Sequence, residues 1–235
     1  MATTTLAPRP VTSRSTTVFL KFLMASTGLF FALFVLMHMY GNLKLLAGED
    51  AYNTYAEHLR TIFTPILPYA GFLWILRVVL IVAVVLHVYA ALTLWARSGS
   101  ARRTRYAAGK AALKTAWMRW GGVTLFLFIV WHLLEFTILK VSVNPDKTGV
   151  AITQNPYQLV VASFQVWWLT LIYVIAMLAL GLHLEHGLFS AMQTLGWTNS
   201  ARTYGYAKIL GYAGAALVVA GFLIPPLAIQ FGLVK

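Results

Sequence analysis

The sequence predicts an all-α integral membrane protein built from five transmembrane helices. Of its 235 residues, 60% are hydrophobic and only 10% are charged, whereas a soluble domain carries about 25% charged residues. Five apolar stretches reach the roughly 20 residues that a helix needs to cross a bilayer, and a helix satisfies its own backbone hydrogen bonds in lipid. The spans are expected at residues 18–43, 69–95, 117–139, 162–189 and 206–224.

The first span follows a tail, residues 1–16, in which Ser, Thr and Pro predominate. Such a composition predicts disorder. The apolar run behind the tail is too long for a signal peptide, and no small-residue cleavage site follows it. This span is therefore expected to be retained, and residues 17–235 are expected to form one membrane domain.

The ends of the later spans carry residues typical of membrane helices. Trp95 closes the second span, and Trp117 and Trp120 open the third, as expected for aromatic side chains at a membrane interface. The fourth span is apolar over most of its length. The fifth is expected to end at Pro225 and Pro226, because proline interrupts the hydrogen bonding of a helix.

The positive charge indicates how the chain lies in the membrane. There are 18 Lys and Arg against 6 Asp and Glu, a formal net charge of +12. Twelve of these basic side chains fall on the side that holds the N-terminus, five fall on the other side, and Arg77 lies within the second span. Because cytoplasmic loops are enriched in Lys and Arg, the N-terminus is expected in the cytoplasm. A basic excess here also suits anionic lipid or partner surfaces, and no nucleic-acid partner is expected.

Five of the six histidines lie within or at the end of a predicted span. An ionisable side chain is costly there and marks a functional site, although a single histidine is also explained by hydrogen bonding between helices. His38 and His132 lie toward the outer ends of spans one and three, and His87 and His183 lie toward the inner ends of spans two and four. Two imidazoles at matched depth on different helices are what a six-coordinate haem requires, so the pattern predicts two haem sites in a four-helix bundle.

Two alternatives concern the inner pair. His186 shares a helix face with His183 at i, i+3, but His183 lies deeper in the span and is the predicted ligand. A zinc site at this "HLEH" motif is a weak interpretation, because the i, i+4 spacing of the zinc proteases is missing. The chain has no cysteine, which excludes thiolate ligands and cysteine-held iron–sulfur clusters within it.

Small residues near the inner pair favour either haem clearance or close helix packing. Eleven residues on a helix amount to about 16 Å of rise and nearly whole turns, so residues eleven before His38 and His132 lie on the ligand faces at the inner depth. These are Thr27 and Gly121, and they are flanked by Gly28 and Gly122.

Two charged residues lie near the predicted sites. Arg77, ten residues from His87, is expected either to pair with a haem propionate or to extend toward the membrane interface. Glu135 follows His132 by three residues on the same face and is expected either to relay a proton or to orient a neighbouring group.

Three stretches carry a resemblance to a known family: "KFLMASTGLFFALFVLMHMYGNLKLLAGEDAYNTYAEHLR", "FIVWHLLEF" and "LHLEHGLFSAMQTLG". Together they resemble the single-chain, five-helix, di-haem cytochrome b subunit of succinate:quinone oxidoreductases, which is most often paired with menaquinone. The resemblance covers nearly the whole chain after residue 15 and includes the four histidines in order, Trp131 before the third and Gly187 after the fourth.

The resemblance implies a membrane anchor in the cytoplasmic membrane of a bacterium, bound to the flavoprotein and iron–sulfur subunits of succinate dehydrogenase. Electrons would pass through two b haems, inner (His87, His183) then outer (His38, His132), to menaquinone, and the anchor would hold no catalytic residues for succinate itself. The basic stretch from Arg97 to Arg119 would suit docking of the partner subunits, and the whole complex could form oligomers. Some fumarate-reducing relatives carry a glutamate just before the fourth histidine. Its absence here favours succinate oxidation.

The quinone site and two other functions stay open. An outer quinone site would draw on Glu135, Asn42, Tyr55, Glu57 and His58, and an inner one on Lys21 and Ser26; His58 is also explained as a solvated surface histidine. The alternatives are a haem-free anchor that binds only quinone, and a transporter that uses histidines as a proton relay. Against the transporter, the sequence shows no inverted repeat and no matching pair of interrupted spans.

Overall fold

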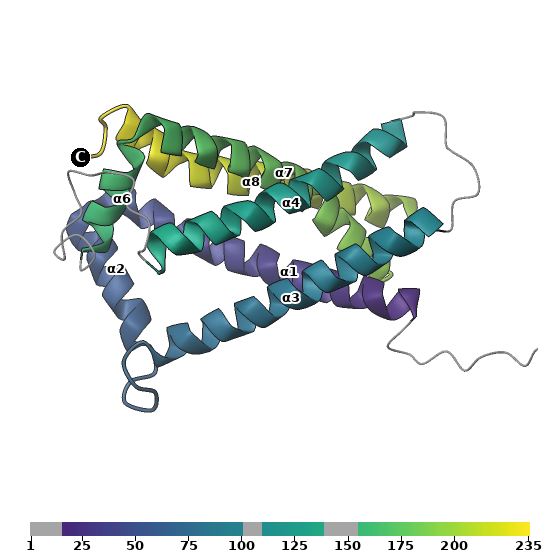
Figure 1. Ribbon diagram of the computed structural model, residues 1–235, viewed down its shortest axis with the longest axis horizontal. Coiled ribbons are helices and arrows are strands. Elements are labelled where there is room, and N and C mark those ends of the chain that lie inside the picture. Colours follow the sequence, from purple (N-terminus) through teal and green to yellow (C-terminus); the bar gives the residue numbers. More distant parts are fainter. Residues whose placement is uncertain (1–15, 101–109, 139–154) are drawn as a thin grey trace, which may run out of the picture.

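The chain is a bundle of five long helices (Figure 1). The computed structural model describes residues 16–100, 110–138 and 155–235, so the predicted disordered tail falls outside the described residues except for Thr16. All five long helices are long and apolar enough to cross a membrane, which confirms the predicted number of spans and makes this a multi-pass membrane protein. They are α1 (Thr17–Leu43), α3 (Gly71–Ser100), α4 (Lys110–Phe136), α7 (Trp167–Thr194) and α8 (Ala201–Gln230).

Short helices gather at one end of the bundle, called here the α2/α6 end (Figure 1). They are η2 (Lys44–Ala47), α2 (Glu49–Thr61) and α6 (Pro156–Phe164). α2 lies between the first two predicted spans, at residues for which no span was expected. Gly48, at a φ of 94°, turns the chain, which glycine does at little cost. Glu49 and Asp50 then lie in the first turn of α2, where negative charge stabilises a helix.

The predicted fourth span was wrong at its start, because α6 and α7 are separate helices. Asn155 caps α6 by accepting a hydrogen bond from the Gln158 backbone N–H, and a proline follows it, a combination that favours a helix start. The chain then turns, and the Thr170 hydroxyl donates to the Phe164 carbonyl at 3.1 Å across the break. The bend lets α6 bury its apolar side chains in a core with the start of α7; they are Tyr157, Val160, Val161 and Phe164.

The predicted end of the fifth span was also wrong, since α8 continues through Pro225 and Pro226 to Gln230. Proline has a φ that suits a helix and lacks only the N–H that would bond to the preceding turn. Both prolines are buried, and in membrane helices neighbouring structure compensates for such interruptions. The last turns of α8 therefore reach the α2/α6 end.

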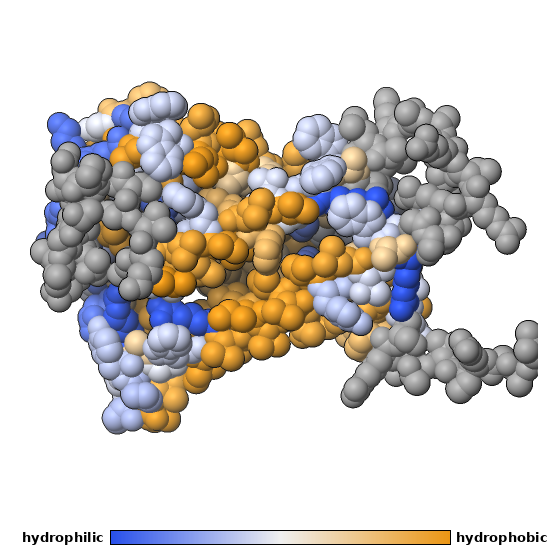
Figure 2. Space-filling view, viewed as in Figure 1, coloured by the Kyte–Doolittle hydropathy of each residue, from blue (hydrophilic) through white to orange (hydrophobic). Residues whose placement is uncertain are grey.

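The helices do not pack evenly. α7 packs along most of α8, α1 lies against α3, α7 and α8, and α4 lies against α7. Within the described residues α3 and α4 are joined by Arg119 of α4, which donates to the Ser98 hydroxyl and stacks over the Trp95 ring of α3, and their backbones otherwise stay apart. Figure 1 shows them running alongside each other on the near face of the bundle, and Figure 2 shows the surface hollowed between them.

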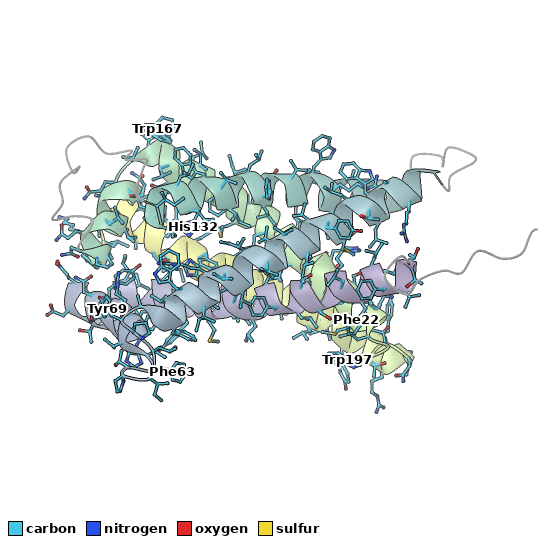
Figure 3. All side chains as sticks on the ribbon, turned by 60° about the horizontal axis from the view of Figure 1, so that its bottom comes forward. Phe22, Phe63, Tyr69, His132, Trp167 and Trp197 are labelled. Atoms are coloured by element: carbon cyan, nitrogen blue, oxygen red, sulfur yellow. The ribbon has the colours of Figure 1, made fainter. Side chains whose placement is uncertain are left out.

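The surface has the distribution expected of a membrane protein. On the face shown in Figure 2, apolar residues form a band across the middle of the bundle, and polar residues lie toward its two ends. Exposed aromatic side chains lie near both ends of the long helices, with Trp167 and Tyr69 at the α2/α6 end and Trp197 and Phe22 at the other (Figure 3). Such aromatic girdles mark the two interfaces of a bilayer.

Candidate functional site

Two histidine pairs connect different helices inside the bundle. His38 of α1 faces His132 of α4, with ring centroids 5.8 Å apart and ring planes at 82°. His87 of α3 faces His183 of α7, with centroids 6.3 Å apart and planes at 58°. The structure therefore brings together the same two pairs of histidines that were predicted from their depth along the spans.

The two pairs lie at different depths. His132 contacts Tyr173 of α7, and His183 lies ten residues farther along the same helix. At 1.5 Å per residue, the pairs are separated by about 15 Å along the bundle. The His38–His132 pair lies toward the α2/α6 end, where Figure 3 shows His132 within the bundle.

Buried hydrogen bonds link His132 to Tyr173 and Tyr173 to Glu135. The Tyr173 hydroxyl donates to the Glu135 carboxylate Oε2 at 3.1 Å and lies 3.1 Å from Nδ1 of His132. The side chains of Ser163 and Trp131 lie near the same carboxyl group. Glu135 is only 2% exposed, and its Oε1 has no hydrogen-bond partner in the part of the chain that the structure describes. Because a buried carboxyl group is costly in a membrane protein, Glu135 is a candidate for a functional role.

Thr27 provides the equivalent contact for His87. Its hydroxyl donates to the Leu23 carbonyl at 2.7 Å, and its oxygen lies 2.9 Å from Nδ1 of His87. The sequence favoured either haem clearance or close helix packing at Thr27. In the structure Thr27 lies against the imidazole of His87 and makes a hydrogen bond with its Nδ1.

The glycines of the inner layer differ in their surroundings. A Cβ on Gly28 would lie 3.5 Å from Cε1 of His87, and a Cβ on Gly122 would lie 3.5 Å from Cε1 of His183. Gly121 faces the backbone, with the Ala179 oxygen 3.8 Å from such a Cβ. Gly28 and Gly122 are therefore the two glycines beside the histidine rings.

Aromatic rings hold the imidazoles in place. Phe34 stacks on His38 with centroids 5.4 Å apart, and Phe31 meets His87 edge-on at 5.8 Å. Phe136 lies 5.4 Å from the ring of His132. Aromatic side chains have few rotamers and pack specifically, so these contacts restrict the orientation of each histidine before anything binds.

The separation of the two imidazoles in each pair is compatible with both of them binding one metal ion. A metal-bound imidazole nitrogen lies about 2.0–2.1 Å from the metal, so two imidazoles on opposite sides of one ion have ring centroids roughly 6 Å apart. The distances of 5.8 and 6.3 Å agree with that span. The hollow between α3 and α4 (Figure 2) lies between helices that each carry one histidine of a pair, His87 on α3 and His132 on α4.

Other metal arrangements find less support. Within residues 16–98, 116–138 and 155–235 no group of three or more His, Cys, Asp or Glu side chains is placed to hold a metal ion. His183 has a buried Nδ1 without a hydrogen-bond partner in those ranges. The zinc interpretation of His183 and His186 therefore gains no third protein ligand from the described residues.

Arg77 lies within α3, ten residues from His87 and toward the α2/α6 end. Its guanidinium group stacks over the ring of Trp74 on the same helix, 4.9 Å from the ring centroid. Ten residues correspond to about 15 Å, so Arg77 lies near the depth of the His38–His132 pair rather than near His87.

The predicted quinone residues fall into different surroundings. Glu57 and His58 are exposed on α2, where Glu57 accepts a hydrogen bond from the Tyr69 hydroxyl at 2.9 Å. Tyr55 packs against Gly41, and Asn42 donates to the His38 carbonyl at 2.8 Å.

The remaining candidates lie elsewhere. Glu135 is buried beside Tyr173, as described above, and Lys21 and Ser26 are exposed on the half of α1 that points away from α2. The structure does not gather the quinone candidates into one cluster.

Tyr173 is the residue of this site that sequence reasoning missed. It lies ten residues before His183 on the same helix, so the depth argument that paired the histidines also places it in the layer of His132. A tyrosine in an apolar span attracts less notice than a histidine, because its ring suits the core and its hydroxyl needs only one partner.

Comparison with known proteins gives no match to this chain among protein-family models, curated proteins or solved structures.

Proposed function

We propose that this chain is the membrane-anchor cytochrome b subunit of a succinate dehydrogenase, and that it carries electrons from an iron–sulfur subunit to menaquinone through two b haems. The observation that supports the proposal best is the pair of interhelical histidine contacts. Each joins two helices at one depth, and each has the spacing of two axial ligands.

In this proposal the chain supplies the ligands and their surroundings. His38 and His132 hold one haem, and His87 and His183 hold the other. A bis-histidine haem supplies reversible one-electron transfer. Thr27 and Tyr173 occupy Nδ1 of His87 and of His132, and such outer contacts orient metal-bound histidines.

The two ends of the bundle then have separate tasks. The end that carries Lys21, Arg97 and Arg119 would meet the iron–sulfur subunit. Its basic side chains suit an acidic partner surface, because complementary charge speeds and orients association. At the α2/α6 end, buried Glu135 would take part in proton exchange with a quinone near the His38–His132 pair.

The test is a pyridine-haemochrome assay of the purified complex, with haem counted per copy of this chain. The wild type is expected to contain two b haems. Replacement of His87 or of His132 by Gln is expected to leave one haem each, with different components missing from the reduced-minus-oxidised spectra. His58→Gln serves as the matched control, because His58 is exposed on α2, and it is expected to retain both haems.

The outcomes separate the alternatives. Absence of haem from an assembled, active complex would support the haem-free quinone anchor. Absence of both haem and partner subunits, with proton transport by the isolated chain, would support a histidine-relay transporter. Loss of the same spectral component in both variants would mean that the four histidines do not form two sites.

A further inference from the structure

We propose that Tyr173 is a positioning residue for His132, and that with Glu135 behind it Tyr173 holds the imidazole proton on Nδ1 and leaves Nε2 bare for a metal. This inference rests on the proposed function, in which His132 binds haem iron. It assigns roles to two buried side chains that ligation itself does not use.

When Glu135 is ionised, the count of protons fixes the direction of the contacts, because a carboxylate can only accept a hydrogen bond. A tyrosine hydroxyl has one proton to donate, and Tyr173 donates it to Oε2 of Glu135. Its oxygen can then only accept at the second contact, 3.1 Å from Nδ1 of His132. With Glu135 ionised, the proton of the neutral imidazole lies on Nδ1, and Nε2 keeps the lone pair that a metal requires.

The packing holds this chain of hydrogen bonds in one geometry. Tyr173 is 8% exposed and Glu135 is 2% exposed, so water does not compete with them. Phe128 and Phe164 each meet the Tyr173 ring edge-on, with centroids 4.8 Å away. With its ring held on both sides, the phenol has little freedom to point its hydroxyl elsewhere.

The second layer repeats the device with different chemistry. The Thr27 hydroxyl donates to the Leu23 carbonyl, so its oxygen accepts from Nδ1 of His87 and leaves Nε2 bare there too. In each pair, the tautomer of one imidazole is thus fixed by a hydrogen bond at its Nδ1. At His87 the partner is a neutral hydroxyl on a backbone carbonyl, and at His132 it is a phenol on a carboxyl group.

The test reads the tautomer directly, by ¹⁵N nuclear magnetic resonance of histidine-labelled, haem-free protein in detergent micelles. In the wild type His132 is expected as the Nδ1–H form. Tyr173→Phe is expected to let the proton distribute over both nitrogens. In haem titrations the same variant is expected to weaken the His38–His132 site by about 10–100-fold, the usual effect of losing an outer contact, and to leave the His87–His183 site unchanged.

Tyr157→Phe is the matched control. Tyr157 belongs to the same buried cluster as Tyr173, and its hydroxyl donates to the Lys235 carbonyl at 3.2 Å rather than to a histidine. Tyr157→Phe should disturb the packing of the cluster about as much as Tyr173→Phe does, and it should leave the tautomer of His132 unchanged. An unchanged tautomer in Tyr173→Phe, or the same change in Tyr157→Phe, would overturn the proposal.

Variants of Glu135 test the direction of the hydrogen bonds that link Glu135, Tyr173 and His132. Glu135→Gln keeps an acceptor oxygen for Tyr173 and is expected to keep the Nδ1–H form of His132. Glu135→Leu removes the acceptor, so the phenol is expected to turn its proton toward Nδ1 and to move the imidazole proton to Nε2. If the wild-type chain binds no haem, the proposed function falls, while the tautomers of haem-free wild type and Tyr173→Phe still decide the role of Tyr173.

Discussion

At the scale of single residues, Tyr52 on α2 is partly buried and packs against the hydrophobic core. Its ring packs against Tyr157, with centroids 6.2 Å apart. Burial, and to a lesser extent the neighbouring Tyr55, raises the pKa of Tyr52 to about 12. An unfolded tyrosine has a pKa of about 10. Between these two values the folded chain keeps a proton that the unfolded chain has released.

This difference predicts a loss of stability in base. Because the unfolded state binds fewer protons than the folded state over this window, the free energy of unfolding falls as the pH rises from about 10 to about 12. The contribution of Tyr52 to that fall is at most roughly 3 kcal/mol. Tyr52→Phe is therefore expected to flatten the decline in the melting temperature of the detergent-solubilised chain between pH 9.5 and 11.5.

The control for this measurement is Tyr206→Phe, which removes an exposed phenol from α8. Its decline with pH is expected to match that of the wild type. Equal slopes for Tyr52→Phe and the wild type would show that deprotonation of Tyr52 does not oppose folding.

The histidine pairs could be predicted from the sequence, but their hydrogen-bonding partners could not. Depth along a straight helix follows from residue number at 1.5 Å per residue, so four histidines sort into two layers without any structure. Whether Thr27 faces the imidazole or the space beside it depends on the rotation of α1 against α3. Side-chain packing between the helices fixes this rotation to within a few tens of degrees. Because that packing depends on many residues together, it cannot be predicted from any one of them.

At the scale of secondary-structure elements, α7 and α8 approach each other closely at Gly211. A Cβ added there would lie 2.7 Å from the backbone oxygen of Glu185. Backbone atoms cannot move aside as the end of a side chain can, so Gly211→Ala is expected to force the helices apart. The expected cost is about 1–3 kcal/mol, measured as a lower melting temperature of the detergent-solubilised chain.

Gly205 provides the matched comparison on the same helix, since a Cβ there would meet nothing within 4 Å. Alanine is a better helix former than glycine by about 1 kcal/mol, so Gly205→Ala is expected to leave stability unchanged or to raise it. A similar loss in both alanine variants would argue against a close crossing at Gly211.

The long helices were predictable because the membrane requires one property of each, an apolar run of sufficient length. The shorter elements obey no such single requirement. α2 carries a polar face and ties itself to α6 through side chains, with Asn53 donating to Asn155 and Asn155 donating to Glu49. Those contacts join residues about a hundred positions apart in the chain. α8 passes through Pro225 and Pro226 because its last turns are buried, which is likewise a tertiary cause.

At the scale of the whole molecule, α3 and α4 contact each other through Arg119 at the end opposite α2 and α6, and each packs mainly against another helix. α3 is attached mainly to α1, and α4 is attached to α7. The contacts that reach across to other helices include the two histidine pairs, His38 with His132 and His87 with His183. Under the proposed function, a ligand bound by both histidines of a pair would tie these helices together and stabilise the bundle in proportion to its affinity.

The unequal charge of the two ends predicts which end faces the cytoplasm. The end opposite α2 and α6 holds Arg97, whose side chain reaches the Thr17 hydroxyl at 3.3 Å, and Arg119, which donates to the Ser98 hydroxyl at 3.0 Å. The described basic residues at the α2/α6 end are fewer; they are Lys44, Arg60 and Lys235. Lys and Arg concentrate on the cytoplasmic side of bacterial membrane proteins, so the α2/α6 end is expected outside.

Reporter fusions in a bacterial host test this orientation. Alkaline phosphatase is active only where disulfides form, outside the cytoplasm, so it is expected to be active when fused after Lys235 and inactive when fused after Asn199, between α7 and α8. Green fluorescent protein at the same two positions should give the reverse pattern. Phosphatase activity after Asn199 but not after Lys235 would show that the orientation in the membrane is the reverse of the predicted one. It would also move Glu135 and the His38–His132 pair to the cytoplasmic half of the membrane, which would place them on the side from which the proposed iron–sulfur partner delivers electrons.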